Sequence, residues 1–351
     1  KGWRRPLMNV TVKMETPVIY FYSEEGFRGT VEIGFRGGSI SQWWPPRQGG
    51  EVPPKYDPPK RGLDEDGLPM KPTPAYFEKL RTTGRIDFGE SQYEGSIKWD
   101  FEVMEPDPRL EEKVFRSGET LNWLRPRQTA SNVIKAGGEF EKYLFYRGVG
   151  NITLPLELKV DSQETLTLRN TGKDAIPYAL VYERTPLGRV GIYELKRGID
   201  PGATITVEES ALFPPVKEKP GYAPPKVGPE FEMMVEGLIG NGLRPDEASA
   251  MVQTWWDSYF EKPGLRVFWV VPGTETERIL PLKITPKPRE MVRVLVGRSE
   301  VLRPRLENQL VKEFQAEKRG AWNVRMAGRY GMAYQERVNE LVPPKVTKAE
   351  P

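Results

Sequence analysis

The sequence predicts a mainly β protein made of immunoglobulin-like β-sandwich domains, with an inserted helical hairpin and a C-terminal helical and aromatic tail. Glycine and proline contribute 34 residues each to the 351-residue chain, which favours turns and short strands over long helices. Many segments alternate apolar and polar residues with a period of two, the pattern of a half-buried strand. The length exceeds that of one comfortable core, so we expect two or three domains.

An N-terminal β domain is predicted for residues 1–43 and 75–150. Its first strand alternates apolar residues such as Val10 and Val12 with polar neighbours, and residues 18–22 follow as a continuous apolar run suited to burial on both faces. A turn and a further alternating strand complete a hairpin. These patterns predict a sheet at the start of the chain.

Residues 44–74 are predicted to form a surface excursion rich in proline and glycine, because they contain three Pro-Pro pairs. Such a run has few backbone donors and favours extended polyproline conformations, and loops of this length are usually functional or disordered. Trp43 and Trp44 stand where the preceding strand meets the excursion. An exposed Trp beside extended chain is typical of interaction surfaces, and the alternative is a Trp that closes over the sheet edge.

A small immunoglobulin-like sandwich is predicted for residues 151–213. Leucines occupy every second position from Leu154 to Leu158, and Leu166 with Leu168 leads into an Asn-Thr-Gly turn. Further strand-like segments follow at short, regular spacing and are separated by Gly and Pro.

A proline-rich linker over residues 214–229 leads into a helical hairpin plus β-strands over residues 230–302. Apolar residues such as Met234 and Leu238 recur at helical spacing, and a Gly-Asn-Gly sequence supplies a stop. The second helix begins near Pro245, where proline costs no hydrogen bond. A nearly all-apolar run follows the hairpin, so we expect a central strand there.

The adjacent Trp255 and Trp256 on the second helix allow two interpretations. They could form a stacking surface for sugars or for a partner. Because aromatic side chains dominate cores, burial against the neighbouring sheet is the simpler interpretation.

A basic C-terminal extension is predicted for residues 303–351. Leu306, Leu310 and Phe314 place one apolar stripe on an otherwise charged helix, and an aromatic segment follows. Ten Lys or Arg residues face five Glu residues between positions 303 and 348. This segment has little core of its own, so we expect it to bury the stripe against this chain or another. The positive excess favours an acidic neighbour or an anionic surface.

The chain has no histidine and no cysteine. This excludes Ser-His-Asp and Cys-His catalysis, zinc sites of the usual kind and disulfides. An acid-base enzyme would need two carboxylates across a cleft, with Glu141, Glu247 and Asp257 as candidates. Glu247 and Asp257 lie about 15 Å apart along one helix, so they cannot pair by themselves. No catalytic, cofactor-binding or metal-binding residue is therefore predicted.

Two weaker constellations involve charged residues. Arg125, Arg127 and Arg147 could form an anion pocket, although ordinary ion pairs are the safer interpretation. The acidic run at residues 64–66 could offer oxygen ligands to calcium, but its spacing does not match an EF-hand loop.

Four segments carry a resemblance to a known family: residues 13–22, 141–150, 246–260 and 292–298. Their order and spacing resemble a family of predicted secreted bacterial proteins of unknown activity. The resemblance covers roughly residues 7–302 and leaves the basic extension outside. It implies export across the cytoplasmic membrane and supplies no catalytic residue.

We therefore expect an exported structural or interaction protein in the periplasm or at the cell surface, as a subunit of a larger assembly. The proline-rich loop and the C-terminal arm are expected to contact its partners. The expected partner is a protein or a second copy, with an anionic surface or a polysaccharide as alternatives. Specific nucleic acid is not expected at a net charge of +3. A carbohydrate-binding sandwich and a carboxylate-based hydrolase are the alternative functions. The residues expected to bind partners are Trp43, Trp44, Leu306, Leu310, Phe314, Trp322, Tyr330 and Tyr334.

Overall fold

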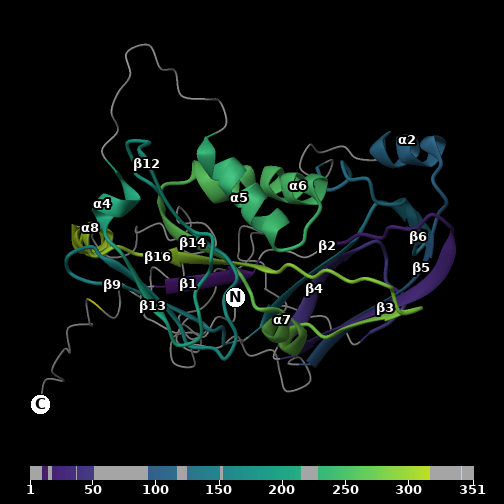
Figure 1. Cartoon of the computed structure of the whole chain (residues 1–351), viewed down its shortest axis with the longest axis horizontal. Helices are drawn as coiled ribbons and strands as arrows, with labels where there is room; N and C mark the ends of the chain where they lie inside the picture. The colour runs from purple at the N-terminus through teal and green to yellow at the C-terminus, as the bar shows by residue number, and fades with distance from the viewer. Residues whose placement is uncertain are drawn as a thin grey trace, which may run out of the picture.

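The computed structural model describes residues 10–14, 18–36, 38–50, 94–116, 125–150, 153–214, 228–316 and 341. The fold is mainly β with a helical hairpin inserted between strands, which confirms the predicted mainly β, sandwich-like class. Figure 1 shows two halves side by side. One half is a sandwich covered by the helical hairpin, and the other is a larger sheet.

The sandwich consists of a five-stranded and a three-stranded antiparallel sheet. The five-stranded sheet has the order β1 (Val10–Met14), β16 (Val296–Val301), β14 (Gly264–Val270), β11 (Ala179–Arg184), β12 (Val190–Leu195). The three-stranded sheet has the order β13 (Thr204–Val207), β10 (Leu166–Asn170), β9 (Leu156–Val160). Buried side chains of both sheets belong to one hydrophobic core, so the sheets pack face to face.

A helical hairpin covers the outer face of the five-stranded sheet. It comprises α5 (Pro229–Gly240) and α6 (Pro245–Trp256), which continues into the π-helical turn η2 (Asp257–Glu261). Along β11, Ala179 and Val181 face the sandwich core, whereas Leu180 and Tyr182 pack against the helices. Because both faces are covered, the central strands are buried along almost their whole length.

The second half is an eight-stranded sheet. Its main path runs β15 (Leu282–Thr285), β3 (Phe27–Arg36), β5 (Glu94–Val103), β4 (Gly38–Trp44), β8 (Leu144–Gly150), β2 (Val18–Ile19), while β6 (Ile134–Ala136) pairs with β5 and with β7 (Glu139–Glu141). One face is buried through residues such as Val31 and Trp99, and the other is polar through residues such as Glu32 and Lys98. This alternation is the pattern that the sequence displays.

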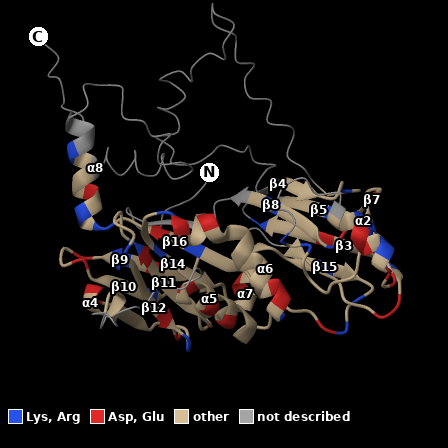
Figure 2. Ribbon diagram, turned by 90° about the horizontal axis from the view of Figure 1, so that it is seen from above, with Lys and Arg blue, Asp and Glu red and all other residues tan. Residues whose placement is uncertain are grey.

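Shorter helices complete the fold: α2 (Pro108–Arg116), α4 (Glu209–Leu212), α7 (Gly273–Ile279) and α8 (Pro304–Ala316). Figure 2 shows α8 standing off the end of the sandwich that lies farthest from β4 and β8.

The beginning of α6 joins the two halves. The Tyr22 hydroxyl donates to Glu247 Oε1 at 2.8 Å, and Glu247 Oε2 accepts the backbone N–H of Arg244 at 2.9 Å. Asp246 Oδ2 accepts the backbone N–H of Ala130 at 2.6 Å. Burial and the bond to Glu247 raise the pKa of Tyr22 well above its usual range, so this hydroxyl stays protonated.

The sheets cross the domain boundaries expected from the sequence. β1 from the expected N-terminal domain pairs with β16, and β15 from residues 230–302 pairs with β3. β14 and β16 complete the sandwich that was expected to consist of residues 151–213 alone. Alternation identifies a strand, but pairing between distant strands depends on packing that no local pattern encodes. The excursion over residues 51–74, most of the linker and residues 317–340 lie outside the described residues.

Candidate functional site

The residues expected to bind partners lie at two separate places. Trp43 and Trp44 end β4 in the eight-stranded sheet, whereas Leu306, Leu310 and Phe314 lie in α8 at the far end of the sandwich. The other three expected residues, Trp322, Tyr330 and Tyr334, lie outside the described residues. The structure therefore presents two candidate surfaces, one around Trp44 and one along α8.

Trp43 and Trp44 point to opposite faces of β4, as neighbours in a strand do. Trp43 is half-buried against the core, and the Arg47 guanidinium lies 5.0 Å from the centre of its ring. Trp44 is 38% exposed, and its indole N–H donates to Glu141 Oε2 at 3.0 Å. Its ring is thus held in place at the surface.

The carboxylate beneath Trp44 is fully buried and fully engaged. Arg127 donates to both Glu141 oxygens, from Nε at 2.9 Å and from Nη2 at 2.8 Å. The backbone N–H of Lys142 adds a bond at 2.9 Å. Such a bidentate, charge-assisted pair fixes both side chains, so Glu141 is a structural anchor and is badly placed to exchange protons with a substrate.

The three arginines considered for an anion pocket have different roles. Arg127 pairs with Glu141, as described above. Arg125 donates to Gln253 Oε1 at 2.8 Å and so contacts α6. Arg147 lies on β8, where it donates to Gln42 Oε1 at 3.4 Å. The structure does not gather these three guanidinium groups into one pocket.

A clamp of two arginines and three acids fixes the beginning of α8. Arg303 is buried, and its Nε lies 2.9 Å from both oxygens of Glu183 at the end of β11. Arg303 Nη1 donates to the backbone carbonyl of Glu164 at 2.6 Å. Arg305 bonds Glu183 Oε1 at 3.0 Å and Glu209 Oε1 at 2.7 Å.

This clamp, formed by Glu164, Glu183, Glu209, Arg303 and Arg305, ties α8 to the β9–β10 turn, the end of β11 and the beginning of α4. The hydrogen bond from Arg305 lowers the pKa of Glu209 from its usual value. The direction in which α8 leaves the sandwich is therefore set by the buried Arg303–Glu183 pair and by the partly exposed bonds of Arg305.

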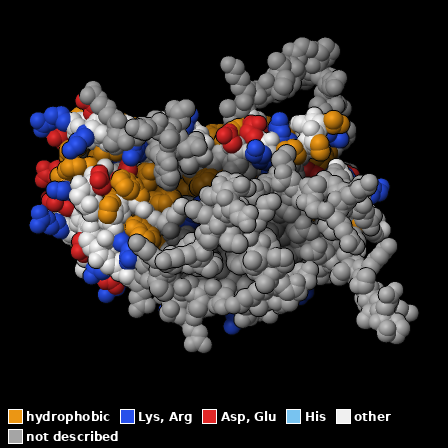
Figure 3. All heavy atoms as spheres, turned by 180° about the vertical axis from the view of Figure 1, so that it is seen from behind, with side chains coloured by type: hydrophobic (Ala, Val, Ile, Leu, Met, Phe, Trp, Pro, Cys, Tyr) orange, Lys and Arg blue, Asp and Glu red, His pale blue; other side chains and the backbone are white. Residues whose placement is uncertain are grey.

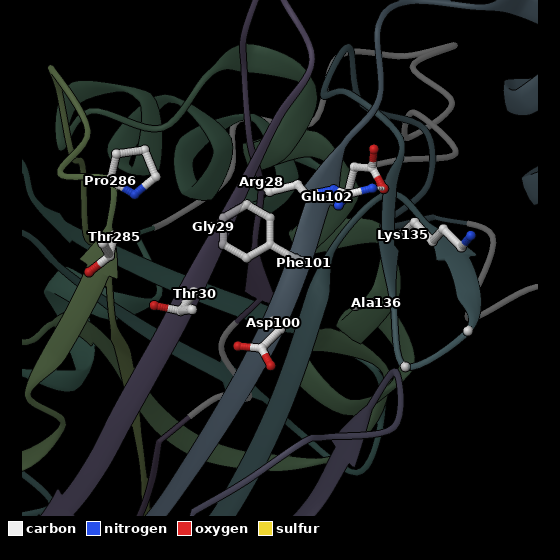
Figure 4. Close-up of a pocket in the computed structure, with 12 residues that line it drawn as sticks. Arg28, Gly29, Thr30, Asp100, Phe101, Glu102, Lys135, Ala136, Thr285 and Pro286 are labelled. Carbon is white, nitrogen blue, oxygen red and sulfur yellow. Dashed lines mark ion pairs between the residues drawn. The ribbon is translucent and has the colours of Figure 1, made fainter.

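An open groove of 640 Å³ lies on the polar face of the eight-stranded sheet. Because Thr285, Thr30 and Asp100 are register partners, they align across β15, β3 and β5. A second row consists of Arg28, Glu102 and Lys135. Figure 4 shows Arg28 and Glu102 pointing toward each other, with Thr30 and Asp100 on neighbouring strands.

The charges that line the groove balance, since Arg28 and Lys135 face Asp100 and Glu102. The Arg28–Glu102 pair spans 3.6 Å and is largely exposed. On the face of the molecule in Figure 3, acidic and basic side chains of the described residues are likewise interspersed. The groove has no net charge that would select a charged ligand.

The remaining acid candidates do not form a catalytic pair with each other. Glu247 is occupied by Tyr22 and by the Arg244 backbone, and Asp257 is exposed at the beginning of η2. Within the described ranges, no three acidic side chains gather where they could hold a metal ion. The acidic run at residues 64–66 lies outside those ranges.

Trp255 and Trp256 pack against the helical side of the five-stranded sheet. Trp256 lies 5.0 Å from Phe260 between ring centres and donates its indole N–H to Glu261 at 2.9 Å. Both rings are half-buried, so they contribute mainly to the packing of α6.

None of the helices in the described part of the chain is both long and apolar enough to cross a bilayer. Comparison of the chain with protein-family models, with curated proteins and with solved structures gave no match.

Sequence reasoning missed the clamp at α8 and the role of Glu141. Arg303 and Glu183 are 120 residues apart, and Trp44 and Glu141 are 97 apart. No spacing rule joins residues at such distances. The only signal was compositional, because charged residues within otherwise apolar segments must find partners when they are buried.

Proposed function

We propose that the protein is an interaction subunit of an extracytoplasmic assembly and that α8 is the element that contacts a protein partner. The supporting observation is the clamp at Arg303 and Arg305. Burying Arg303 and Glu183 is costly unless they are paired, and here their pair, together with the bonds of Arg305, fixes a helix at its first turn. The described part of the chain places no other helix or strand extensively along α8.

The composition of α8 is consistent with a partner-binding helix. Leu306 and Val311 are half-buried, and the apolar stripe continues in sequence through Leu310 and Phe314. A helix with one apolar stripe gains stability by packing that stripe into a groove. Because the clamp sets the direction of α8 beforehand, less conformational entropy is lost on binding.

The location and the finer fold class belong to the same proposal. Export rests on the resemblance of residues 7–302 to secreted bacterial proteins. An immunoglobulin-like relationship of the sandwich rests on its antiparallel sheets and their shared core. The enzyme alternative is less favoured, because the acids that meet at the clamp each accept hydrogen bonds from an arginine.

The proposal is tested with variants of the full chain that change the stripe without touching the clamp. The double variant Leu306→Gln and Val311→Gln removes apolar surface, and Asn308→Ala with Lys312→Ala is the matched control on the same helix. Sedimentation velocity measures self-association. A photo-cross-linker at Asn308, with one at Leu187 as the reference position, measures contact with other proteins in an envelope preparation.

We expect the wild type and the control to associate alike and the stripe variant to lose most of the association, while the unfolding temperatures of all three agree. Any cross-linked protein is then purified and its binding measured directly. The proposal is contradicted if the protein is a monodisperse monomer and the stripe substitutions leave the cross-links at both Asn308 and Leu187 unchanged.

A further inference from the structure

A second surface, separate from α8, lies on the outward face of β4 and β8. The register pairs Gln42 with Arg147 and Trp44 with Phe145. Trp43 and Tyr146, which pair between them, turn toward the core. Alternation then places Gln42, Trp44, Phe145 and Arg147 together on the opposite side, which we call the Trp44 face.

The Trp44 ring is a stacking platform with its polar atom already satisfied. Its N–H donates inward to Glu141, which is 0% exposed and held by Arg127. The part of the indole that reaches solvent is therefore mainly its apolar ring. Because the bond to Glu141 restricts the ring, a ligand that stacks on it finds the ring already ordered.

Planar polar groups stand beside this platform. Gln42 lies two residues before Trp44 on β4, is exposed, and accepts from Arg147 at 3.4 Å. Arg147 is also exposed. An amide and a guanidinium group each offer paired hydrogen-bonding atoms in a plane, which matches the vicinal hydroxyls of a sugar or the carboxylate of a uronic acid.

We propose that the Trp44 face binds an oligosaccharide, with one pyranose ring stacked on Trp44 and the hydroxyl groups of the next within reach of Gln42. Sugars have an apolar ring face and a polar rim, which is the combination that this surface offers. A shallow, partly polar strand surface suits such a ligand better than a protein partner, whose strongest contacts need a desolvated pocket. This inference does not depend on α8.

The test measures binding of three hexasaccharide probes to the full chain by isothermal titration calorimetry. The probes are a β-1,4-linked glucose hexamer, a β-1,4-linked N-acetylglucosamine hexamer and a hexamer of galacturonic acid. Trp44→Ala removes the platform. Gln42→Ala keeps Trp44 and its bond to Glu141, so it tests the surface without disturbing the buried pair. Leu187→Ala is the control, because that side chain is 98% exposed on another part of the molecule.

We expect at least one hexamer to bind, Trp44→Ala to weaken it tenfold or more, Gln42→Ala to weaken it severalfold and Leu187→Ala to leave it unchanged. Preference for the galacturonate hexamer, lost in Arg147→Gln, would identify an acidic sugar. Preference for either neutral hexamer would identify a neutral one.

The proposal is overturned if no hexamer binds the wild type, or if both Trp44→Ala and Gln42→Ala bind like the wild type. Dependence of a protein partner on Trp44, without sugar binding, also overturns it. Failure of the α8 stripe variant to change association leaves these outcomes unaffected, so the two proposals fail separately.

Discussion

The five-stranded sheet of the sandwich and the eight-stranded sheet differ in how many layers cover them. In β14 nearly every residue is buried, because the three-stranded sheet lies on one face and the helical hairpin on the other. In β5 buried and partly exposed residues alternate, because only one face meets the core. The burial pattern along a strand therefore indicates whether one or both faces of its sheet are covered.

The two halves also differ in where their charged side chains form ion pairs. Among described residues of the sandwich, charges such as Arg266 and Glu300 are buried and paired. On the polar face of the eight-stranded sheet, Glu32 and Lys98 form an exposed pair at 3.4 Å. Substitutions at comparable strand positions should therefore have very different costs.

Removing a large side chain beneath the helical hairpin should cost the most stability. Phe268 on β14 is fully buried against the hairpin, so Phe268→Ala should lower the free energy of unfolding by about 3–5 kcal/mol. Asp100→Ala on the polar face of β5 should change it by no more than about 0.5 kcal/mol. Urea denaturation of both variants measures the difference. Equal costs would show that the two sheets are not covered as described.

A smaller effect tests how tightly α5 packs on the sheet. A Cβ added at Gly237 would come within 2.2–2.6 Å of the Tyr178 ring, so Gly237→Ala should destabilise the fold by about 1–3 kcal/mol. Gly240 lies on the same helix with nothing within 4 Å, so Gly240→Ala should stabilise it by up to about 1 kcal/mol. Opposite shifts in the unfolding temperature are expected. Shifts of the same sign would contradict the close approach.

The polar face of the eight-stranded sheet provides the next test. Arg28 and Glu102 form a largely exposed pair, so a double-mutant cycle with Arg28→Ala and Glu102→Ala should give a coupling of about 0.2–1 kcal/mol that salt reduces. The cycle is measured by denaturation at low and high ionic strength. A coupling of several kcal/mol would mean that this face is buried by something else.

The smallest effect concerns pH and the root of α8. The pKa of Glu209 is lowered by its bond to Arg305, so the folded state gains stability above the usual value of 4.5 and loses this gain as the pH falls through the lowered pKa. Glu209→Gln should therefore be less stable than the wild type at pH 7, by less than about 1 kcal/mol, because the pair is partly exposed.

Thermal unfolding of the wild type and Glu209→Gln between pH 7 and pH 3 measures this gap. It should narrow toward the acidic end, as the falling pH protonates the carboxyl in the folded state as well as in the unfolded state. A gap that widens as the pH falls would contradict the assigned bond. Asp200→Asn, which changes an exposed acid in a turn, is the control.

Local patterns were sufficient to predict most of the fold class. Alternation predicted β3 and β9, and Pro245 marked the beginning of α6. The nearly all-apolar run became the central strand β14. These signals succeed because they depend on neighbours within a few residues.

The pairing of strands and the anchoring of the two surfaces could not be predicted. β1 and β16 pair although they are more than 280 residues apart in the sequence, and Trp44 meets Glu141 only because β4 and β7 belong to one sheet. The position of Trp44 at the end of a strand suggested an interaction surface. Its exposure and the bond that fixes its indole could be known only from the three-dimensional fold. Nonlocal burial decides such contacts.

The chain crosses between the two halves several times, so the halves should unfold together. The chain passes from one half to the other between β1 and β2, between β8 and β9, and again before and after β15. Each half is therefore built from several separate segments of the chain. Unfolding of one half also removes the ends that hold strands of the other half in place. Calorimetry should accordingly record a single cooperative endotherm, in which both halves disappear together.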